Sequence, residues 1–152
     1  MKQLSISVLF LFLVCAGLSS CSKDDDDDAP TPKSLIVGKW YVNKAVVTEY
    51  TGTTVTNTTT TASYTAEDFF ELQSDGKYLY PIEGQAALEV GSYVLNDAGT
   101  MLSLHEEDDV DDYDVDELTG NTLVISQTFT YTEAGVPKKV IEVITHSKTA
   151  SK

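Results

Sequence analysis

The sequence predicts an all-β fold, an eight- to nine-stranded antiparallel up-and-down barrel, with a β-sandwich as the alternative. Beyond residue 33 the chain consists of short segments rich in β-branched and aromatic residues, and turn-forming residues separate them. No segment there shows the 3.6-residue apolar period of a helix. Consecutive hairpins favour an up-and-down order, and closing the sheet removes its exposed edges.

The strands follow from residue type and from the turns between them. Eight of the eleven residues at 51–61 are threonine, which suits a pleated surface better than a helix. Alternation is clearest at 123–131, where Leu123, Ile125, Phe129 and Tyr131 share one face with Gln127. We expect strands at 40–50, 53–64, 69–73, 77–80, 88–95, 100–105, 113–118, 121–132 and 138–147.

The amino-terminal segment reads as a secretory signal. A lysine precedes an apolar run at 4–17 that is too short to span a bilayer. The run ends at Leu18-Ser19-Ser20-Cys21, which resembles the lipobox of bacterial lipoproteins. That resemblance implies cleavage before Cys21 and lipidation of its sulfur. An ordinary signal peptide with an incidental cysteine is the alternative.

Residues 21–33 form the next expected unit, a lipidated cysteine followed by an acidic, disordered tether. Five consecutive aspartates at 24–28 repel one another, and the Ala-Pro-Thr-Pro sequence at 29–32 keeps the chain extended. Cys-Ser-Lys-Asp-Asp at 21–25 resembles the acidic export signal of some surface lipoproteins of Gram-negative bacteria. We therefore expect an outer-membrane lipoprotein exposed at the cell surface, with its β-domain at 34–152.

A family resemblance supports the barrel. Gly38-Lys39-Trp40 resembles the Gly-x-Trp with which lipocalin-like domains enter their first strand. Asp75-Gly76, Gly91-Ser92-Tyr93 and the turn at 118–123 follow in the order found in lipocalin-like lipoproteins of Gram-negative bacteria, over roughly residues 34–147. The resemblance implies that Trp40 is a buried plug at the closed end of the barrel. Neither a basic partner for Trp40 nor a carboxy-terminal helix is evident in the sequence.

Composition excludes several functions. The net charge is −14 and all ten basic residues are lysines, so the chain is a poor match for nucleic acid. No nucleophile elbow, phosphate-binding glycine loop or paired-carboxylate motif is visible, and we expect a protein that is not an enzyme and has no cofactor.

Nine of the twelve residues at 106–117 are acidic, which raises the question of a cation site. Asp112, Asp114 and Asp116 begin the spacing of a calcium loop, but Glu117 and Leu123 stand where that loop needs Gly and Glu. We expect a solvated acidic surface. His105 and His146, with Glu106 or Glu107, are a second metal candidate, although both histidines are expected at the surface.

Two functions remain. Aromatic residues could line a pocket or fill the core: Phe70, Tyr78, Tyr80, Tyr93, Phe129 and Tyr131. A hollow barrel would bind a small apolar or amphipathic ligand. A filled barrel would be an accessory or structural surface lipoprotein that binds a protein or glycan. The state of the interior discriminates between them. The sequence does not indicate an oligomeric state.

Overall fold

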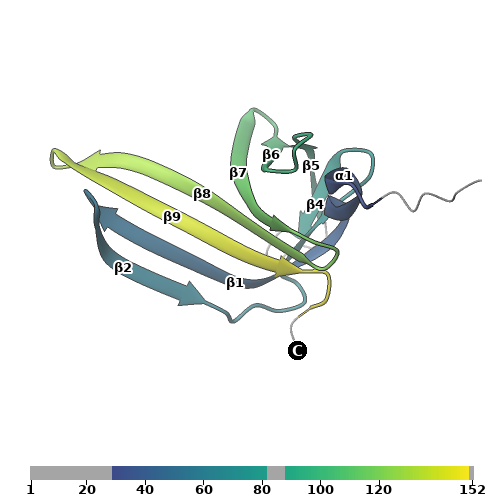
Figure 1. The fold of residues 1–152 in the computed structure, drawn as a ribbon, viewed down its shortest axis with the longest axis horizontal. Coiled ribbons are helices and arrows are strands. Elements are labelled where there is room, and N and C mark those ends of the chain that lie inside the picture. Colours follow the sequence, from purple (N-terminus) through teal and green to yellow (C-terminus); the bar gives the residue numbers. More distant parts are fainter. Residues whose placement is uncertain (1–28, 82–87, 151–152) are drawn as a thin grey trace, which may run out of the picture.

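The computed structural model describes residues 29–81 and 88–150. One short helix and nine strands follow one another along this part of the chain (Figure 1): α1 (Pro32–Ile36), β1 (Gly38–Thr51), β2 (Thr54–Thr61), β3 (Phe69–Leu72), β4 (Lys77–Pro81), β5 (Leu88–Leu95), β6 (Met101–Glu106), β7 (Asp109–Leu118), β8 (Thr122–Glu133) and β9 (Val136–Ser147).

The sheet closes into a barrel, as predicted, rather than a sandwich. From β3 to β9 each strand pairs antiparallel with the next, and β9 pairs back with β1. Strand β1 pairs with β9 along one edge, and it is long enough to pair with two different strands, one after the other, along its opposite edge. Its start, Gly38–Tyr41, pairs with β3, and its end, Ala45–Thr51, pairs with β2. Eight strands therefore form the closed barrel and β2 is an additional strand.

The turns lie where the sequence places them. Ala134 and Gly135 both have positive φ, at 48° and 80°, which is the conformation of a two-residue turn between β8 and β9. One turn was misplaced: Glu107, with φ 47°, and Asp108 form a tight turn inside the acidic stretch. Strand β7 therefore begins at Asp109 and not at residue 113.

The core fills the end of the barrel that α1 covers. Trp40, Leu72, Leu102 and Leu123 are fully buried there, and Ile36 of α1 is 1% exposed. No helix was expected, and the tether was expected to extend to Lys33. Instead Thr31 caps a five-residue helix, accepting a hydrogen bond from the Ser34 amide, and Pro32 occupies its first turn.

Four strands extend well beyond this core. We call the projecting four-stranded sheet, which comprises residues 45–61 and 127–143, the wing; its strand order is β2-β1-β9-β8. Figure 1 shows β1, β2, β8 and β9 running away from the barrel while β7 curves to the other side. Strands β7 and β8 pair only over residues 114–118 and 123–126, so the barrel wall splits beyond that point.

Candidate functional site

The closed end of the barrel is built on Trp40. Its indole N–H donates to the Ile36 carbonyl at 2.7 Å, and its ring is fully buried, as predicted for the plug. The ammonium group of Lys148 lies 4.8 Å from the centre of that ring and donates to the carbonyls of Leu35, at 3.1 Å, and Val37, at 3.0 Å. The expectation that Trp40 has no basic partner was therefore wrong, since a lysine fills the role.

Gly38 is required beside this plug. It enters β1 with φ 131°, a conformation that residues with a side chain rarely adopt. A Cβ atom there would lie 3.5 Å from the Lys148 nitrogen, against the group that covers Trp40. The Gly-x-Trp motif therefore combines a backbone requirement with a buried ring.

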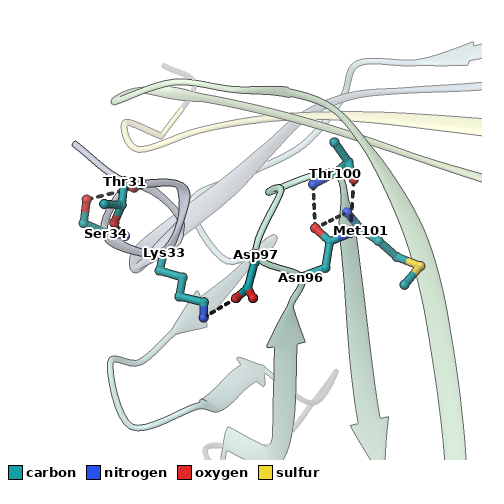
Figure 2. Close-up of polar contacts among 7 residues, drawn as sticks. All are labelled: Thr31, Lys33, Ser34, Asn96, Asp97, Thr100 and Met101. Carbon is teal, nitrogen blue, oxygen red and sulfur yellow. Dashed lines mark hydrogen bonds and ion pairs between the residues drawn. The ribbon is translucent and has the colours of Figure 1, made fainter. Parts of the chain in front are cut away.

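Contacts at the surface join α1 to the turn between β5 and β6 (Figure 2). Lys33 forms a 2.7 Å ion pair with Asp97, which lowers the pKa of that carboxyl through the hydrogen bond and the lysine charge. The Asn96 side chain accepts from the amides of Thr100 and Met101 at 2.8 and 3.2 Å. The ion pair is exposed and contributes little stability, so the burial of Ile36 is what holds the helix over the barrel end.

Four of the six predicted aromatic residues come together in the barrel. Tyr78 is buried, while Phe70, Tyr80 and Tyr93 are partly buried against the core. The rings of Tyr78 and Tyr80 stack with centres 5.8 Å apart, and the Tyr93 hydroxyl donates to the Gln73 carbonyl at 2.8 Å. Phe70, Tyr78 and Tyr93 pack against their neighbours in the closed half of the barrel, and Tyr80 lies at its upper boundary.

Phe129 and Tyr131 lie elsewhere. Both belong to the part of β8 that projects in the wing, and they are 45% and 53% exposed. They lie on the same face of β8 as the buried Leu123 and Ile125. However, β7 stops pairing with β8 at Ser126, so β7 does not cover them. The structure therefore separates them from the other four aromatic residues.

Polar groups replace apolar ones above the core, at the end of the barrel opposite α1. Glu106 accepts hydrogen bonds from the hydroxyls of Tyr78, at 3.3 Å, and Tyr80. Burial raises the pKa of the Tyr113 hydroxyl, and the negative charges of Asp111 and Glu142 raise it further. We call this region the mouth: residues 80, 106, 111, 113 and 142, with 64 beside them.

Glu142 is partly buried on the inner face of β9, in the same alternation as Ile144 and His146. Burial raises the pKa of Tyr64, and Glu142 and then Asp68 raise it further, so the Glu142 carboxylate acts on tyrosines of two separate segments. Tyr64, Tyr113 and Glu142 were not among the predicted site residues. A signal was present for Glu142, which interrupts the apolar run Val140-Ile141-Glu142-Val143-Ile144 in the strand shared by the barrel and the wing.

The barrel wall opens sideways where β7 and β8 separate. A groove of about 420 Å³ lies along the split. Most of its lining residues belong to the outer face of the barrel wall, and Tyr113 and Gln127 of the inner face border it as well; the outer ones are Met101, Val110, Asp112, Asp114, Ser126 and Thr128. Another groove, of about 560 Å³, lies between α1 and β5 at the closed end, where Ile36, Val37 and Leu95 are among its lining residues.

The acidic stretch does not converge on a point. Asp112 and Asp114 pair across from Ser103 and Met101, on the opposite face of β7 from Tyr113, while Asp116 falls in the irregularity between Val115 and Glu117. Within residues 29–81 and 88–150 no three His, Cys, Asp or Glu side chains are grouped as metal ligands.

One of the two histidines was placed incorrectly. His146 is 2% exposed, faces the core against the edge of the Phe70 ring at 4.9 Å, and its Nδ1 atom has no hydrogen-bond partner. Burial lowers its pKa to about 4, and a hydrogen bond to the backbone of Leu123 opposes this. His105 lies on β6 opposite Val110 and is partly exposed. The surface position predicted for His146 is therefore wrong.

Three predictions concern residues outside the described part of the chain: the signal at 1–20, lipidation of Cys21, and the aspartate run of the tether. Among the described helices, none has the length and apolarity needed to span a membrane.

Comparison with known proteins agrees with the geometry. Residues 36–125 match the profile of the lipocalin-like domain family, which covers the barrel from the end of α1 to the first residues of β8. A search of curated proteins gave no match. The family profile matches more than half of the chain, and the barrel is plugged by Trp40 at one end. This chain therefore belongs to the lipocalin-like domain family.

Proposed function

We propose that this barrel binds a small amphipathic ligand at its mouth and does not catalyse a reaction. The observation that carries this proposal is the change in the interior along the barrel axis. At the closed end, the side chains of Trp40, Leu102 and Leu123 are completely buried. Above, the inward-facing residues are polar or charged and only partly buried, Tyr113 and Glu142 among them, and the barrel wall splits between β7 and β8 beside Tyr113.

The residues of the mouth define the ligand's chemistry. The tyrosine rings at 80 and 113, with Leu104 next to them on the core, offer apolar surface to a short hydrocarbon or ring. The charged groups nearby, Glu106 and Glu142, are hydrogen-bond acceptors. An amphipathic ligand whose head group donates hydrogen bonds or carries a positive charge fits these groups better than a fatty acid, whose carboxylate they would repel.

A second function has a specific observation in its favour. The closed half of the barrel is packed, and Phe129 and Tyr131 are exposed on the wing. Exposed aromatic side chains are enriched where proteins contact partners. An accessory surface protein that binds a protein or glycan through the wing is therefore the alternative, and it needs no space at the mouth.

We further propose that the chain is lipid-anchored at Cys21 and exposed at the outer-membrane surface. This rests on the lipobox-like sequence at 18–21 and the acidic residues after it. Cys21→Ala should give protein that leaves the detergent phase in phase separation. Unchanged partitioning of that variant would refute the anchor, and it would leave the ligand proposal standing.

Displacement of a fluorescent amphipathic amine tests the binding site. We expect saturable binding that Glu142→Gln weakens about tenfold, the loss of one charge-assisted contact of roughly 1.4 kcal/mol. Tyr131→Leu on the wing is the matched control and should bind as the wild type does. If Tyr131→Leu abolishes binding while Glu142→Gln does not, the site is on the wing and the accessory function is favoured.

A further inference from the structure

Strand β2 is the outermost strand of the wing, and its composition is unusual for that position. All eight of its residues, Thr54–Thr61, are exposed. Six are threonines and the others are Val55 and Asn57, so the strand contains no charged residue and no proline. Threonine and valine favour extended backbone, and β2 is therefore a regular strand held by its neighbour on one side.

The other side of β2 is unpaired in the part of the chain that the structure describes. Within the described part of the chain it pairs with β1 and with no other strand, and it ends the sheet order. Natural sheet edges are usually protected by lysine, proline, a bulge or short length. The one irregularity, between Glu49 and Tyr50, lies near the hairpin end, and Asn57–Thr61 then pair regularly with β1. Backbone groups along this edge are available to a further strand.

We propose that β2 pairs antiparallel with β2 of a second copy of this chain, an inference independent of the ligand site. The two wings would join edge to edge, so that one continuous sheet runs from β8 of one copy to β8 of the other. Backbone hydrogen bonds between the two edges supply the affinity, as in other cases of strand addition.

Charge distribution favours a second copy approaching at this edge. The chain has a net charge of −14, so two copies repel each other in most orientations. The wing is the exception, because its residues 45–61 and 127–143 contain three acidic and two basic side chains, and β2 contains none. The nine acidic residues at 106–117 belong to β6, β7 and their turn, which lie outside the wing.

The edge is also complementary to itself. In an antiparallel pair centred between Asn57 and Thr58, residue 54 meets 61 and residue 56 meets 59, and each of these pairs joins two threonines. Cross-strand threonine pairs stabilise antiparallel sheets. Shifting the centre to Thr58 places 56 opposite 60 and 58 opposite 58, which again pairs threonine with threonine. No like charges meet in either register.

The test is the mass of the full-length chain in detergent, measured by sedimentation over a wide range of concentration. We expect a dimer that dissociates on dilution. Thr58→Lys with Thr60→Lys places like charges across the two-fold axis and should give a monomer. Thr128→Lys with Thr130→Lys makes the same change on exposed threonines of β8 and should remain a dimer. The fluorescence of Trp40 verifies that each variant is folded.

Several results would overturn the proposal: a monomer at every concentration, a dimer that the β2 lysines leave intact, or equal loss of the dimer in both lysine pairs. Cross-linking adds a second measurement. In a chain carrying Cys15→Ser and Cys21→Ala, Asn57→Cys with Thr58→Cys should form an intermolecular disulfide in either register, because 57 meets 58 in the first and 58 meets 58 in the second, and opposite residues in paired strands lie within disulfide distance. Thr130→Cys should not, and equal cross-linking in β2 and in β8 would also contradict the proposal.

Discussion

Gly91 of β5 lies directly opposite Tyr78 of β4, and the tyrosine ring occupies the space where a side chain at 91 would be. A Cβ atom at Gly91 would lie 2.2 Å from Cε1 and 2.6 Å from Cζ of Tyr78. It would also lie 2.6 Å from the carbonyl oxygen of His105 on β6. Gly91→Ala therefore meets both a side chain and a backbone atom.

Neither neighbour can move at little cost. Tyr78 is 5% exposed and its hydroxyl donates to Glu106, so displacing the ring breaks packing and a hydrogen bond together. The His105 carbonyl belongs to a strand paired with β5 through Ser92. Overpacking of this kind costs about 1–3 kcal/mol, and the backbone contact places Gly91→Ala at the upper end, about 3 kcal/mol. For a domain of this size that corresponds to roughly 10 °C in Tm.

Urea denaturation followed by Trp40 fluorescence measures the effect, with the denaturant slope m expected to stay constant. Gly120→Ala is the matched control, because Gly120 has no heavy atom within 4 Å of a built Cβ and does not have positive φ. It should be neutral or stabilise the fold by about 0.4–1 kcal/mol. If Gly91→Ala proves as stable as Gly120→Ala, the packing of Tyr78 over β5 is wrong.

Three further predictions concern the closed end and the acidic strand. Lys148→Met removes two hydrogen bonds to carbonyls and the cation over Trp40 while keeping an apolar stem, and should lower the free energy of unfolding by about 2 kcal/mol. Lys139→Met, which removes the cation from the partly exposed ring of Tyr50, is the control and should change the free energy of unfolding by less than about 1 kcal/mol. Because burial depresses the pKa of His146 to about 4 from 6.5, its contribution to stability is complete above pH 6.5 and falls as the pH drops toward 4. The wild type should lose roughly 3 kcal/mol over that range relative to His146→Leu, and parallel pH profiles of the two proteins would contradict the burial of a neutral imidazole. Millimolar calcium should raise Tm no more than magnesium or ionic-strength-matched sodium does, and a calcium-specific rise abolished by Asp112→Asn with Asp114→Asn would establish a true site.

Strand positions were predictable because they depend on local chemistry. β-Branched segments and turn residues located all nine strands, and the alternation at 123–125 identified residues that are buried. The helix was overlooked because five residues are too few to show a helical period, although Thr31 and Pro32 are typical of a helix start. Its cap is visible in the sequence, and only its packing over the barrel makes it stable.

Features that depend on distant residues could not be predicted. Alternation assigned Phe129 and Tyr131 to the inner face correctly, but it does not indicate whether another strand lies opposite, and here β7 has turned away. Lys148 reaches Trp40 from the far end of the chain, and His146 is buried because the register places it beside Leu123. The mouth has the same origin, since the charge of Glu142 on β9 acts on Tyr113 of β7 only after the barrel closes.

The central claim is that the mouth holds an amphipathic ligand, and native mass spectrometry tests it most directly. The full chain, isolated from its host in mild detergent, would be measured beside Glu142→Gln prepared in the same way. We predict a bound small molecule on the wild type, an amine or a compound rich in hydrogen-bond donors, at much lower occupancy on the variant. A wild-type spectrum with only the ligand-free mass, from preparations whose Trp40 fluorescence shows a folded barrel, would contradict the claim.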